Sequence, residues 1–570
     1  EAELLYARGV PPQTTYVFKH AFTQEAAYRS LLTTRRRELH HRVAVTLEAL
    51  FPDRLEEHYG PLAYHYCEAA QGDEVAKAIA YAMRAGTRNM ALPAYAEAIR
   101  FYRMALQALE RQEPQEPIDE ARRCPLLLAL GEAQRQASEH LEAQETLLRA
   151  ADIARTLGST ERLVRAAVEL GWLTIEVGLP AAPAVRLLEE ALQKLGAEDS
   201  LLKAKTLGGL AQVLGITGAQ QQALVYAQQA VAMARRFADP ELLAANLQGM
   251  IYAFQGPEHT QQRLAYASEM LQLAQAASAK RLLSNALFWR MYCLLELGDM
   301  PATDAALDAL ARVAEELQLP FELCVATGFR AMRALMQGRF VDSERLAQEA
   351  LTIGQRLQTE NAAGIFGLQM FTLRREQGRL KELEPVVRYF VKEHTAAAAW
   401  RPGLTLIYSE LGRTEEARAE FEHLAQHNFA DLPRDGLWMG CMTYLVDVCT
   451  SLGDRARAAT LYQLLLPYAG RNVVIGNAVA CYGALSRYLG ALATTLGRWD
   501  EAAQHFEDAL AMNACMEARP WLAHTQYQYG TMLLARDQPG DGEKARALLS
   551  AALVTARELG MRALEECLTA

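Results

Sequence analysis

The sequence predicts an all-α protein built as an α-solenoid, a superhelix of stacked antiparallel helix pairs. Three observations lead to this prediction: a motif that returns about every 40 residues, helical spacing of apolar residues within that motif, and almost no strand signal. Because a repeat array grows by adding pairs, the length of 570 residues does not require several unrelated domains.

Six segments share the recurring motif. In each, a glycine is followed five residues later by a small residue, four later by an aromatic, Leu or Ala, and three later by Ala or Leu. In the segment "GRWDEAAQHFEDAL" these residues are Gly497, Ala502, Phe506 and Ala509. Spacings of four and three place the side chains on one helix face, and the glycine suits a left-handed turn that ends the preceding helix. The six segments begin at Gly218, Gly338, Gly412, Gly453, Gly497 and Gly540.

Turn glycines are predicted at a nearly constant spacing. From Gly178 to Gly540, nine intervals span 362 residues, about 40 each, and Ser138 lies one period earlier. Each unit therefore holds two helices of roughly 15 to 18 residues. The pattern resembles the tetratricopeptide repeat, and its long period resembles the extended variant of bacterial signal-transduction ATPases and MalT-type regulators. The predicted turns are at residues 178, 218, 256, 298, 338, 378, 412, 453, 497 and 540.

Composition and charge exclude several classes of protein. A hydrophobic fraction of 51% with 22% charged residues is typical of a folded protein, and a net charge of −10 argues against nucleic acid as a partner. Nine cysteines without a CxxC pair favour a reducing, cytoplasmic location. The longest uncharged run, residues 206–234, holds six glutamines and is predicted to be a buried helical hairpin, so no membrane contact is expected.

Motifs for catalysis are missing from the sequence. It has no GxxxxGK[ST] phosphate loop, HExxH or GxSxG, and no GxGxxG after a strand. His58 and His65 lie seven residues apart among aromatics, which favours packed core residues over metal ligands. We therefore predict no catalytic residue, no cofactor and no metal, and this chain is not expected to be an enzyme.

A basic stretch lies near the start, in "YVFKHAFTQEAAYRSLLTTRRRELHHRV" from Tyr16 to Val43. Arg35, Arg36, Arg37 and His40 are predicted on the outer side of an amphipathic helix. Three interpretations stay open: a solvated helix face, a contact with an acidic or nucleotide-bearing neighbouring domain, and DNA binding. The expected apolar stripe of this helix is Leu31, Leu32, Leu39, Val43 and Leu47.

Two stretches carry a resemblance to a family. Residues 16–50 resemble the junction that follows the ATPase and winged-helix segment in bacterial proteins joining a class III adenylate or guanylate cyclase, an AAA-like (STAND-type) ATPase and a tetratricopeptide tail. Residues 471–536 resemble the end of those proteins and of LuxR-type regulators, and the two stretches cover about a fifth of the chain. The family's phosphate loop and cyclase aspartates have no counterpart here. The matching positions are Phe18, His20, Gln24, Glu25, Tyr28, Leu31, Leu32, Arg36 and His40.

Three regions are expected along the chain. Residues 1–60 are predicted to be the mostly helical junction segment, 61–124 irregular helical or capping repeats, and 125–570 the repeat superhelix. Clusters of Pro and charge mark seams at residues 111–125, 427–436 and 467–477. The one short extended candidate is "TTYVFKH", residues 14–20.

The predicted function is that of a non-catalytic sensor and scaffold. A superhelix offers a concave groove for a protein or peptide partner, and in a full-length parent the bound state would bias an upstream ATPase through the junction helix. Two alternatives stay open: the effector-sensing tail of a MalT/LuxR-type transcription regulator, and a stand-alone peptide-binding adaptor. Nearest-neighbour stacking also predicts that the chain unfolds in segments.

Groove positions follow from the repeat geometry. Residues three, six, ten and thirteen before each turn glycine are expected to face the groove, and Arg35, Arg36, Arg37 and His40 are the expected junction contacts. The polar and aromatic groove candidates are Lys205, Gln212, Asn246, Asn285, Tyr292, Thr443, Asp447, Arg487 and Tyr527.

Overall fold

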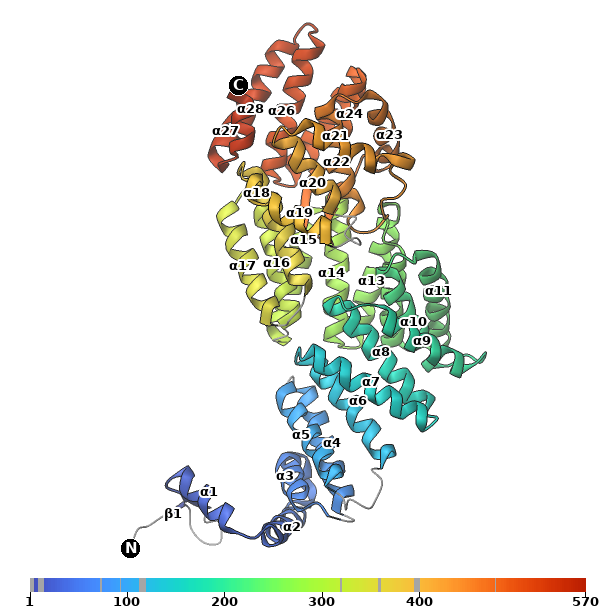
Figure 1. Cartoon of the computed structure of the whole chain (residues 1–570), viewed down its shortest axis with the longest axis vertical. Coiled ribbons are helices and arrows are strands. Elements are labelled where there is room, and N and C mark those ends of the chain that lie inside the picture. The colour runs from blue at the N-terminus through green and yellow to red at the C-terminus, as the bar shows by residue number, and fades with distance from the viewer. Residues whose placement is uncertain are drawn as a thin grey trace. The chain divides into compact units, whose positions relative to one another are not determined.

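A computed structural model describes residues 5–8, 15–71, 74–92, 94–111, 119–317, 320–356, 360–393, 400–476 and 478–569. These residues form 28 α-helices, five short 3-10 helices and two small antiparallel sheets (Figure 1). Most helices pack against their neighbours in sequence as hairpins. The predicted fold class is confirmed: the protein is an all-α, tetratricopeptide-like solenoid.

The chain divides into two compact units, residues 1–169 and residues 170–570. The division falls inside helix α8 (Thr160–Val177). The predicted extended segment is confirmed as strand β2 (Thr15–Phe18), which pairs with β1 (Leu5–Arg8). The helices of unit 1 before α8 are α1 (Ala21–Ser30), α2 (Thr33–Leu50), η1 (Pro52–His58), α3 (Tyr59–Ala69), α4 (Glu74–Ala91), α5 (Tyr95–Glu110), α6 (Glu120–Gln136) and α7 (His140–Thr156).

Unit 2 continues the helix pairs. Its helices up to residue 393 are α9 (Ala182–Leu195), α10 (Leu201–Ile216), α11 (Gln220–Phe237), α12 (Pro240–Ala253), η2 (Pro257–His259), α13 (Thr260–Ala276), α14 (Lys280–Leu297), α15 (Met300–Leu317), α16 (Pro320–Met336), α17 (Phe340–Arg356), α18 (Glu360–Glu376), η3 (Leu380–Glu382) and α19 (Glu384–Glu393). The remaining elements are α20 (Trp400–Glu410), α21 (Thr414–Leu424), η4 (Gln426–Phe429), α22 (Trp438–Leu452), α23 (Arg455–Leu465), η5 (Leu466–Tyr468), β3 (Asn472–Ile475), β4 (Ala480–Ala484), α24 (Leu485–Leu496), α25 (Trp499–Cys515), α26 (Arg519–Arg536), α27 (Asp541–Leu559) and α28 (Arg562–Thr569).

The predicted turn glycines lie where the pattern placed them, with one exception. Nine of the ten have a positive φ, between 64° and 88°, and Ser138 has a φ of 66°. Gly256 is the exception: its φ is −66° and its ψ is 152°. Because Pro257 follows it, Gly256 is held in extended backbone, and the turn prediction there is wrong.

The repeat motif marks the packed helix faces, as predicted. In α25, Ala502, Phe506 and Ala509 are all buried. The segment at 206–234 is the helical hairpin of α10 and α11, and the described residues contain no helix long and apolar enough to cross a membrane. Helix lengths depart from the prediction between residues 384 and 496, where α19, α20, α21, α23 and α24 have only 10 to 12 residues.

The predicted seams have different structures. Residues 112–118 of the first seam lie outside the described residues, and residue 125 falls inside α6. The second seam is an irregular loop in which His427, Asn428 and Phe429 have positive φ. The third contains strand β3, and this strand was not expected.

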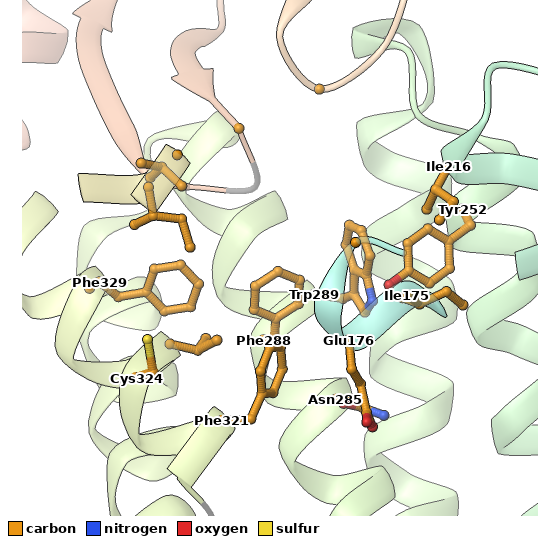
Figure 2. A pocket seen from close by; sticks show the side chains of 18 of the residues that line it. Ile175, Glu176, Ile216, Tyr252, Asn285, Phe288, Trp289, Phe321, Cys324 and Phe329 are labelled. Atoms are coloured by element: carbon orange, nitrogen blue, oxygen red, sulfur yellow. The ribbon is translucent and has the colours of Figure 1, made fainter. Parts of the chain in front are cut away.

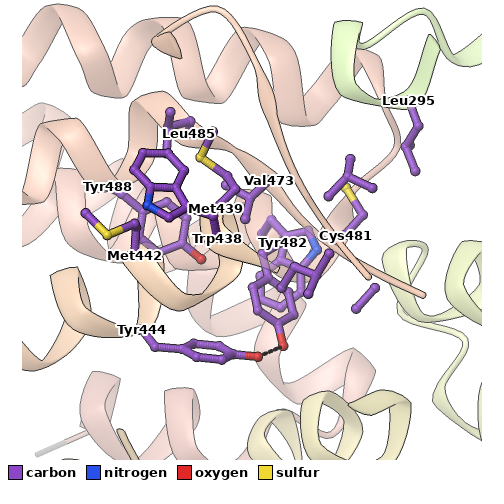
Figure 3. Packing of buried hydrophobic residues seen from close by; sticks show 14 of the residues in the cluster. Leu295, Trp438, Met439, Met442, Tyr444, Val473, Cys481, Tyr482, Leu485 and Tyr488 are labelled. Atoms are coloured by element: carbon purple, nitrogen blue, oxygen red, sulfur yellow. Dashed lines mark hydrogen bonds between the residues drawn. The ribbon is translucent and has the colours of Figure 1, made fainter. Parts of the chain in front are cut away.

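A β-hairpin of β3 and β4 is buried within unit 2. Figure 3 shows its side chains packed among helices, with the Tyr482 hydroxyl 2.5 Å from the Tyr444 hydroxyl. Tyr482 also lies 2.8 Å from Oγ1 of Thr372, on α18. The sequence did not indicate this hairpin, because each strand has only four or five residues and β4 runs directly into α24.

Unit 2 closes on itself. The Asn472 side chain on the hairpin donates to the Leu295 carbonyl at 2.8 Å, and Arg333 Nη1 donates to the Met516 carbonyl at 3.0 Å. His524 Nε2 lies 2.8 Å from a carboxylate oxygen of Glu376. These bonds join residues 148 to 183 positions apart. Stacking in unit 2 is therefore not limited to nearest neighbours, which removes the basis for predicting segmental unfolding there.

Candidate binding cavity

A cavity of about 770 Å³ lies within unit 2 (Figure 2). Helices α8, α10, α12, α14, α16, α18 and α20 all contribute to its wall, and each is the first helix of its pair. The cavity therefore lies on the side of the array that the first helices of the pairs face. Its volume lies within the range of about 300 to 1,000 Å³ that is common for ligand sites.

One half of the cavity is apolar. Phe288 of α14 stacks on Phe329 of α16 with ring centroids 5.4 Å apart, and Phe321 lines the same region. In Figure 2 these rings and Cys324 lie on one side of the site, away from Tyr252 and Ile216. Further apolar lining residues are Val325, Ile365, Leu368, Trp400, Leu437 and Val479.

The other half carries charged groups. Arg281 of α14 lies between two carboxylates, with its nitrogens 3.6 Å from Glu176 Oε1 and 3.8 Å from Glu322 Oε1. The Glu176 and Glu322 side chains are only 14% and 8% exposed. Carboxylates with so little water around them interact strongly with any charge that enters.

Neutral polar groups lie beside these charges. Asn285 Nδ2 donates to Gln248 Oε1 at 3.3 Å. Tyr252 packs edge-on against Trp289 with centroids 5.1 Å apart. Burial and the nearby Glu176 charge raise the pKa of Tyr252 to about 12, although a bond with Gln248 opposes this. The Tyr252 hydroxyl is therefore neutral at pH 7 and available for hydrogen bonds.

Segments from later in the chain close one end of the cavity. Residues 435–437 and Val479 of the hairpin line this end. Gln369 Nε2 of α18 ties the hairpin to α16, because it donates to the carbonyls of Val479 at 3.1 Å and Gly328 at 2.8 Å. Asp435 accepts from the Leu437 N–H at 2.8 Å, and burial raises the pKa of its carboxyl.

The structure places one of the nine predicted groove residues, Asn285, on the cavity wall. Five others are buried within the protein: Gln212, Asn246, Tyr292, Thr443 and Arg487. For example, Gln212 Nε2 donates to the Ala245 carbonyl at 3.0 Å. These five side chains stabilise helix contacts and are not accessible to a partner in this structure.

Three predicted groove residues have other surroundings. Asp447 forms an ion pair with Arg375 at 2.6 Å, Lys205 is exposed, and Tyr527 is half-buried. Partner contact at any of the nine positions stays a prediction. The burial has a physical reason where a partner is seen: Gln212 and Asn246 bond to the backbone of the adjacent helices α12 and α11, and Arg487 Nη1 donates to Gln528 of α26 at 3.3 Å.

Positions ten and thirteen follow the groove rule at three consecutive turns in the middle of unit 2. Before Gly298, Gly338 and Gly378 these positions all line the cavity, and they are Phe288, Asn285, Gly328, Val325, Leu368 and Ile365. Glu176, Arg281 and Glu322 were missed because they fall outside the rule. Their signal in the sequence is weak, since isolated charges on helices are most often solvated.

The four basic junction residues lie on α2 and have separate environments. Arg35 pairs with Glu38 at 2.5 Å, Arg36 lies over the Tyr28 ring at 5.1 Å, and Arg37 reaches Gln71 Oε1 at 3.5 Å. His40 is buried. The prediction of a basic outer side is therefore wrong for His40, and contacts of the arginines with another domain stay a prediction.

The predicted apolar stripe of this helix is also displaced. Leu32 is 77% exposed and Val43 is 41% exposed, whereas His40 and Ala44 are buried. His40 takes the inner position because its ring finds two partners, the Tyr28 hydroxyl at 3.0 Å and His65 Nδ1 at 2.8 Å.

The stability of unit 1 is expected to fall with acidification through this histidine pair. Burial lowers the pKa values of His40 and His65 below their usual 6.5. The unfolded chain then binds more protons just below pH 6.5, so stability is present above that pH and is lost as the pH falls further. Protonating both rings also breaks their hydrogen bond, worth about 1 kcal/mol. Protection factors of residues 33–70, which correct the exchange rates for the intrinsic pH dependence of amide exchange, measure this at pH 7.5 and 5.5. Equal protection factors at the two pH values would contradict the prediction.

No group of three or more His, Cys, Asp or Glu side chains within the described ranges is arranged to hold a metal ion. His58, which the sequence suggested is a packed residue, stacks on Phe51 with centroids 4.1 Å apart. Seven of the nine cysteines are buried.

Comparisons with known proteins give weak likenesses to helical repeat proteins. No protein-family model matches the chain, and no curated protein matches it. The Rap conjugation gene regulator of plasmid pLS20 in complex with the Phr* peptide aligns with a TM-score of 0.35 and 16% identity, over 52% of this chain and 76% of that one. A STAND ATPase from Pyrococcus horikoshii with a tetratricopeptide repeat sensor aligns with a TM-score of 0.33 and 12% identity, over 60% of this chain and 55% of that one. The APC/C hetero-tetramer Cut9-Hcn1 aligns with a TM-score of 0.34 and 15% identity, over 85% of this chain and 96% of that one.

Proposed function

We propose that this chain is a non-catalytic sensor and scaffold that binds a protein or peptide segment in the cavity of unit 2. The observation that carries the proposal is the convergence of seven first helices on one cavity with aromatic walls and a few polar groups. This combination of a large apolar lining and a small set of polar groups is typical of binding sites.

The cavity is also placed to report on a bound ligand. Its wall joins helices from residue 172 to residue 400 with segments at 435–437 and 476–479. A ligand that contacts both groups of segments would bind the closed arrangement more tightly than an opened one. Such differential affinity is what a sensor needs to shift a conformational equilibrium.

We further propose that a full-length parent carries a signalling ATPase of the cyclase-associated type, with α2 as the contact to it. The support is the resemblance of residues 16–50 to such a junction and the three consecutive arginines, Arg35 to Arg37, on α2. Sequencing the coding DNA upstream of the Glu1 codon tests this part. An open frame that continues into a phosphate-loop ATPase supports it, and a start codon directly upstream contradicts it.

Binding in the cavity is tested with a variant that fills it. Gly364 of α18 lines the cavity, and a Cβ built there meets no atom within 4 Å, so the Cβ of Gly364→Leu causes no clash and the rest of its side chain adds volume. Gly364→Ala is the matched control, because it makes the same helix-stabilising change with little added volume. Peptides selected from a phage-displayed library on the wild-type chain are expected to bind Gly364→Leu at least tenfold more weakly and Gly364→Ala unchanged.

Calorimetry on the selected peptides measures these affinities. Selection of no peptide, or equal binding to Gly364→Leu and wild type, would rule out this cavity as the peptide site. A second filling variant, Gly328→Leu, enters from α16, where an added Cβ meets only Ile365 at 3.8 Å. If Gly364→Leu and Gly328→Leu both weaken peptide binding, the loss does not come from a local effect of either substitution.

A further inference from the structure

We propose that helix α2 pairs in antiparallel orientation with α2 of a second copy of this chain, so that two copies form a dimer through unit 1. The contact surface is the outer stripe of α2, which we define as Leu32, Leu39, Val43 and Leu50. This inference goes beyond the proposed function and does not rest on it, because it concerns unit 1 and needs no ligand in the cavity of unit 2.

The outer stripe follows one side of the helix. Leu39, Val43, Thr46 and Leu50 follow one another at spacings of four, three and four residues, which place their side chains on one face. Leu32, the N-cap residue of α2, lies seven residues before Leu39. Spacings of four and three that repeat every seven residues are those of helices that pair along their length.

The outer stripe is largely exposed among the described residues of unit 1. Leu32 is 77% exposed, Val43 is 41% exposed and Leu50 is 64% exposed. The helix packs a different face on α3, through Ala44 and Leu47 (Figure 1). A helix with a second apolar face beside the one that it buries is typical of a protein interaction site.

The outer stripe is symmetric about residue 41. Leu39 and Val43 lie two residues on either side of it, and Leu32 and Leu50 lie nine residues on either side. In an antiparallel pair centred at residue 41, Leu39 of one copy therefore meets Val43 of the other, and Leu32 meets Leu50. A two-fold symmetric interface requires a self-complementary surface of this kind.

The charges at the two ends of α2 favour a second copy as the partner. Residues 29–37 contain four arginines and no acid, a net charge of +4, whereas residues 45–57 contain four acids and one arginine, a net charge of −3. Asp53 and Glu56, in the acidic end, are exposed. An antiparallel pair places the basic end of each copy beside the acidic end of the other, and a parallel pair would place like charges together. A second copy thus supplies both the apolar stripe and the opposite charges in the required order.

The length of the helix limits the affinity of such a dimer. Helix α2 has 18 residues and is therefore about 27 Å long. One pair of helices of this length gives an interface at or below the lower end of the roughly 1,200 to 2,000 Å² that stable complexes bury. We therefore expect a dissociation constant in the micromolar range.

Sedimentation velocity of the whole chain at concentrations from about 1 to 100 μM tests the dimer. The expected result is a change from monomer to dimer across this range. Val43→Glu places a charge in the outer stripe and should weaken the dimer at least tenfold. Val45→Glu is the matched control, because Val45 is 42% exposed on the same helix but two residues away, and side chains at that spacing do not share a face. It should leave the dimer unchanged.

Crosslinking tests the orientation of the two helices. Leu32→Cys and Leu50→Cys are made separately in a chain whose two exposed cysteines, Cys515 and Cys567, are replaced by serine. With a short bis-maleimide, a mixture of the two variants should crosslink more strongly than either variant alone, because an antiparallel pair brings residue 32 of one copy beside residue 50 of the other.

Three outcomes overturn the inference. A chain that stays monomeric up to about 100 μM has no such dimer. A dimer that Val43→Glu and Val45→Glu weaken equally, or that neither weakens, does not use the outer stripe. Stronger crosslinking of each cysteine variant alone than of the mixture contradicts the antiparallel orientation. Circular dichroism of every variant checks that it is folded. None of these outcomes bears on the cavity or on an upstream ATPase, because the sample contains this chain alone.

Discussion

Replacing Arg263 by alanine is expected to lower the free energy of unfolding of unit 2 by about 3 to 5 kcal/mol. The Arg263 side chain on α13 is 1% exposed and lies 2.7 Å from Glu296 of α14, which is 9% exposed. The guanidinium also lies over the Tyr292 ring at 5.1 Å. Removing the arginine leaves the Glu296 carboxylate in the interior without its counter-charge, and this accounts for the large loss.

The matched control removes both charges. In the double variant Arg263→Met and Glu296→Leu, apolar side chains of similar size replace the pair, so most of the lost stability should return. Urea unfolding followed by circular dichroism measures the midpoint for each variant, and hydrogen exchange of α13 and α14 locates the effect. A loss below 1 kcal/mol for Arg263→Ala, or a double variant as unstable as the single one, would contradict this account.

The loss of stability in Arg263→Ala should also weaken ligand binding in the cavity. Helix α14 carries Arg281, Asn285, Phe288 and Trp289 on the cavity side, and its partner helix α13 is held to it through Arg263. Loosening this pair should therefore weaken the ligands selected on the wild-type protein, and the double variant should recover both stability and affinity.

The helix pairs could be predicted from sequence because local physics determines them. A turn after an α-helix often needs a positive φ, which glycine adopts at little cost, so the periodic glycines mark the helix ends. Ala502, Phe506 and Ala509 at spacings of four and three mark the buried face in the same way. Gly256 shows where the rule failed, since the proline after it restricts the backbone more strongly than the period does.

The closure of unit 2 could not be predicted in this way. The bonds from Asn472 to Leu295 and from Arg333 to Met516 join residues more than 170 positions apart, and no local pattern records such pairs. Every residue of the two hairpin strands is buried, so the strands show no alternation of apolar and polar residues by which they could be recognised. Contacts of this kind depend on the curvature that all the stacked pairs produce together.

The candidate site could be predicted only in part, because a local sequence pattern does not record contacts between segments far apart in the chain. The first helix of each pair does face the concave side, and Asn285 lies on the cavity as expected. Tyr292, only two turns further along the same helix, is buried against Arg263. The periodic pattern identifies the concave face, but it does not tell which part of that face the chain itself covers.

Replacing Gly483 by alanine is expected to destabilise unit 2 by about 2 to 5 kcal/mol, through the hairpin that holds it closed. Gly483 in β4 has a φ of 71°, which costs an alanine about 1 to 2 kcal/mol. A Cβ there would also lie 2.7 Å from Cβ of Trp521 and against the side-chain oxygen of Asn513. Overpacking of this kind costs about 1 to 3 kcal/mol more.

Gly412 provides a control with the same backbone conformation. Its φ is also 71°, but a Cβ there meets no atom within 4 Å, so Gly412→Ala should cost only about 1 to 2 kcal/mol. The difference between the two variants isolates the packing of the hairpin against α25 and α26. Asn513 joins these elements, since its side chain accepts from the Ala484 N–H at 2.9 Å and donates to Thr525 at 3.1 Å.

The set of helices in which Gly483→Ala speeds hydrogen exchange distinguishes a closed unit from an open array. In a closed unit, Gly483→Ala should speed hydrogen exchange in α16 and α18 as well as in α24 to α26, because Gln369, Thr372 and Arg333 bond across the closure. In an open array, faster exchange would remain confined to the helices next to the hairpin. Exchange that rises only in α24 to α26 would therefore show that the closure contributes little to stability, and the cavity wall from residues 435–437 and 476–479 would then be free to open.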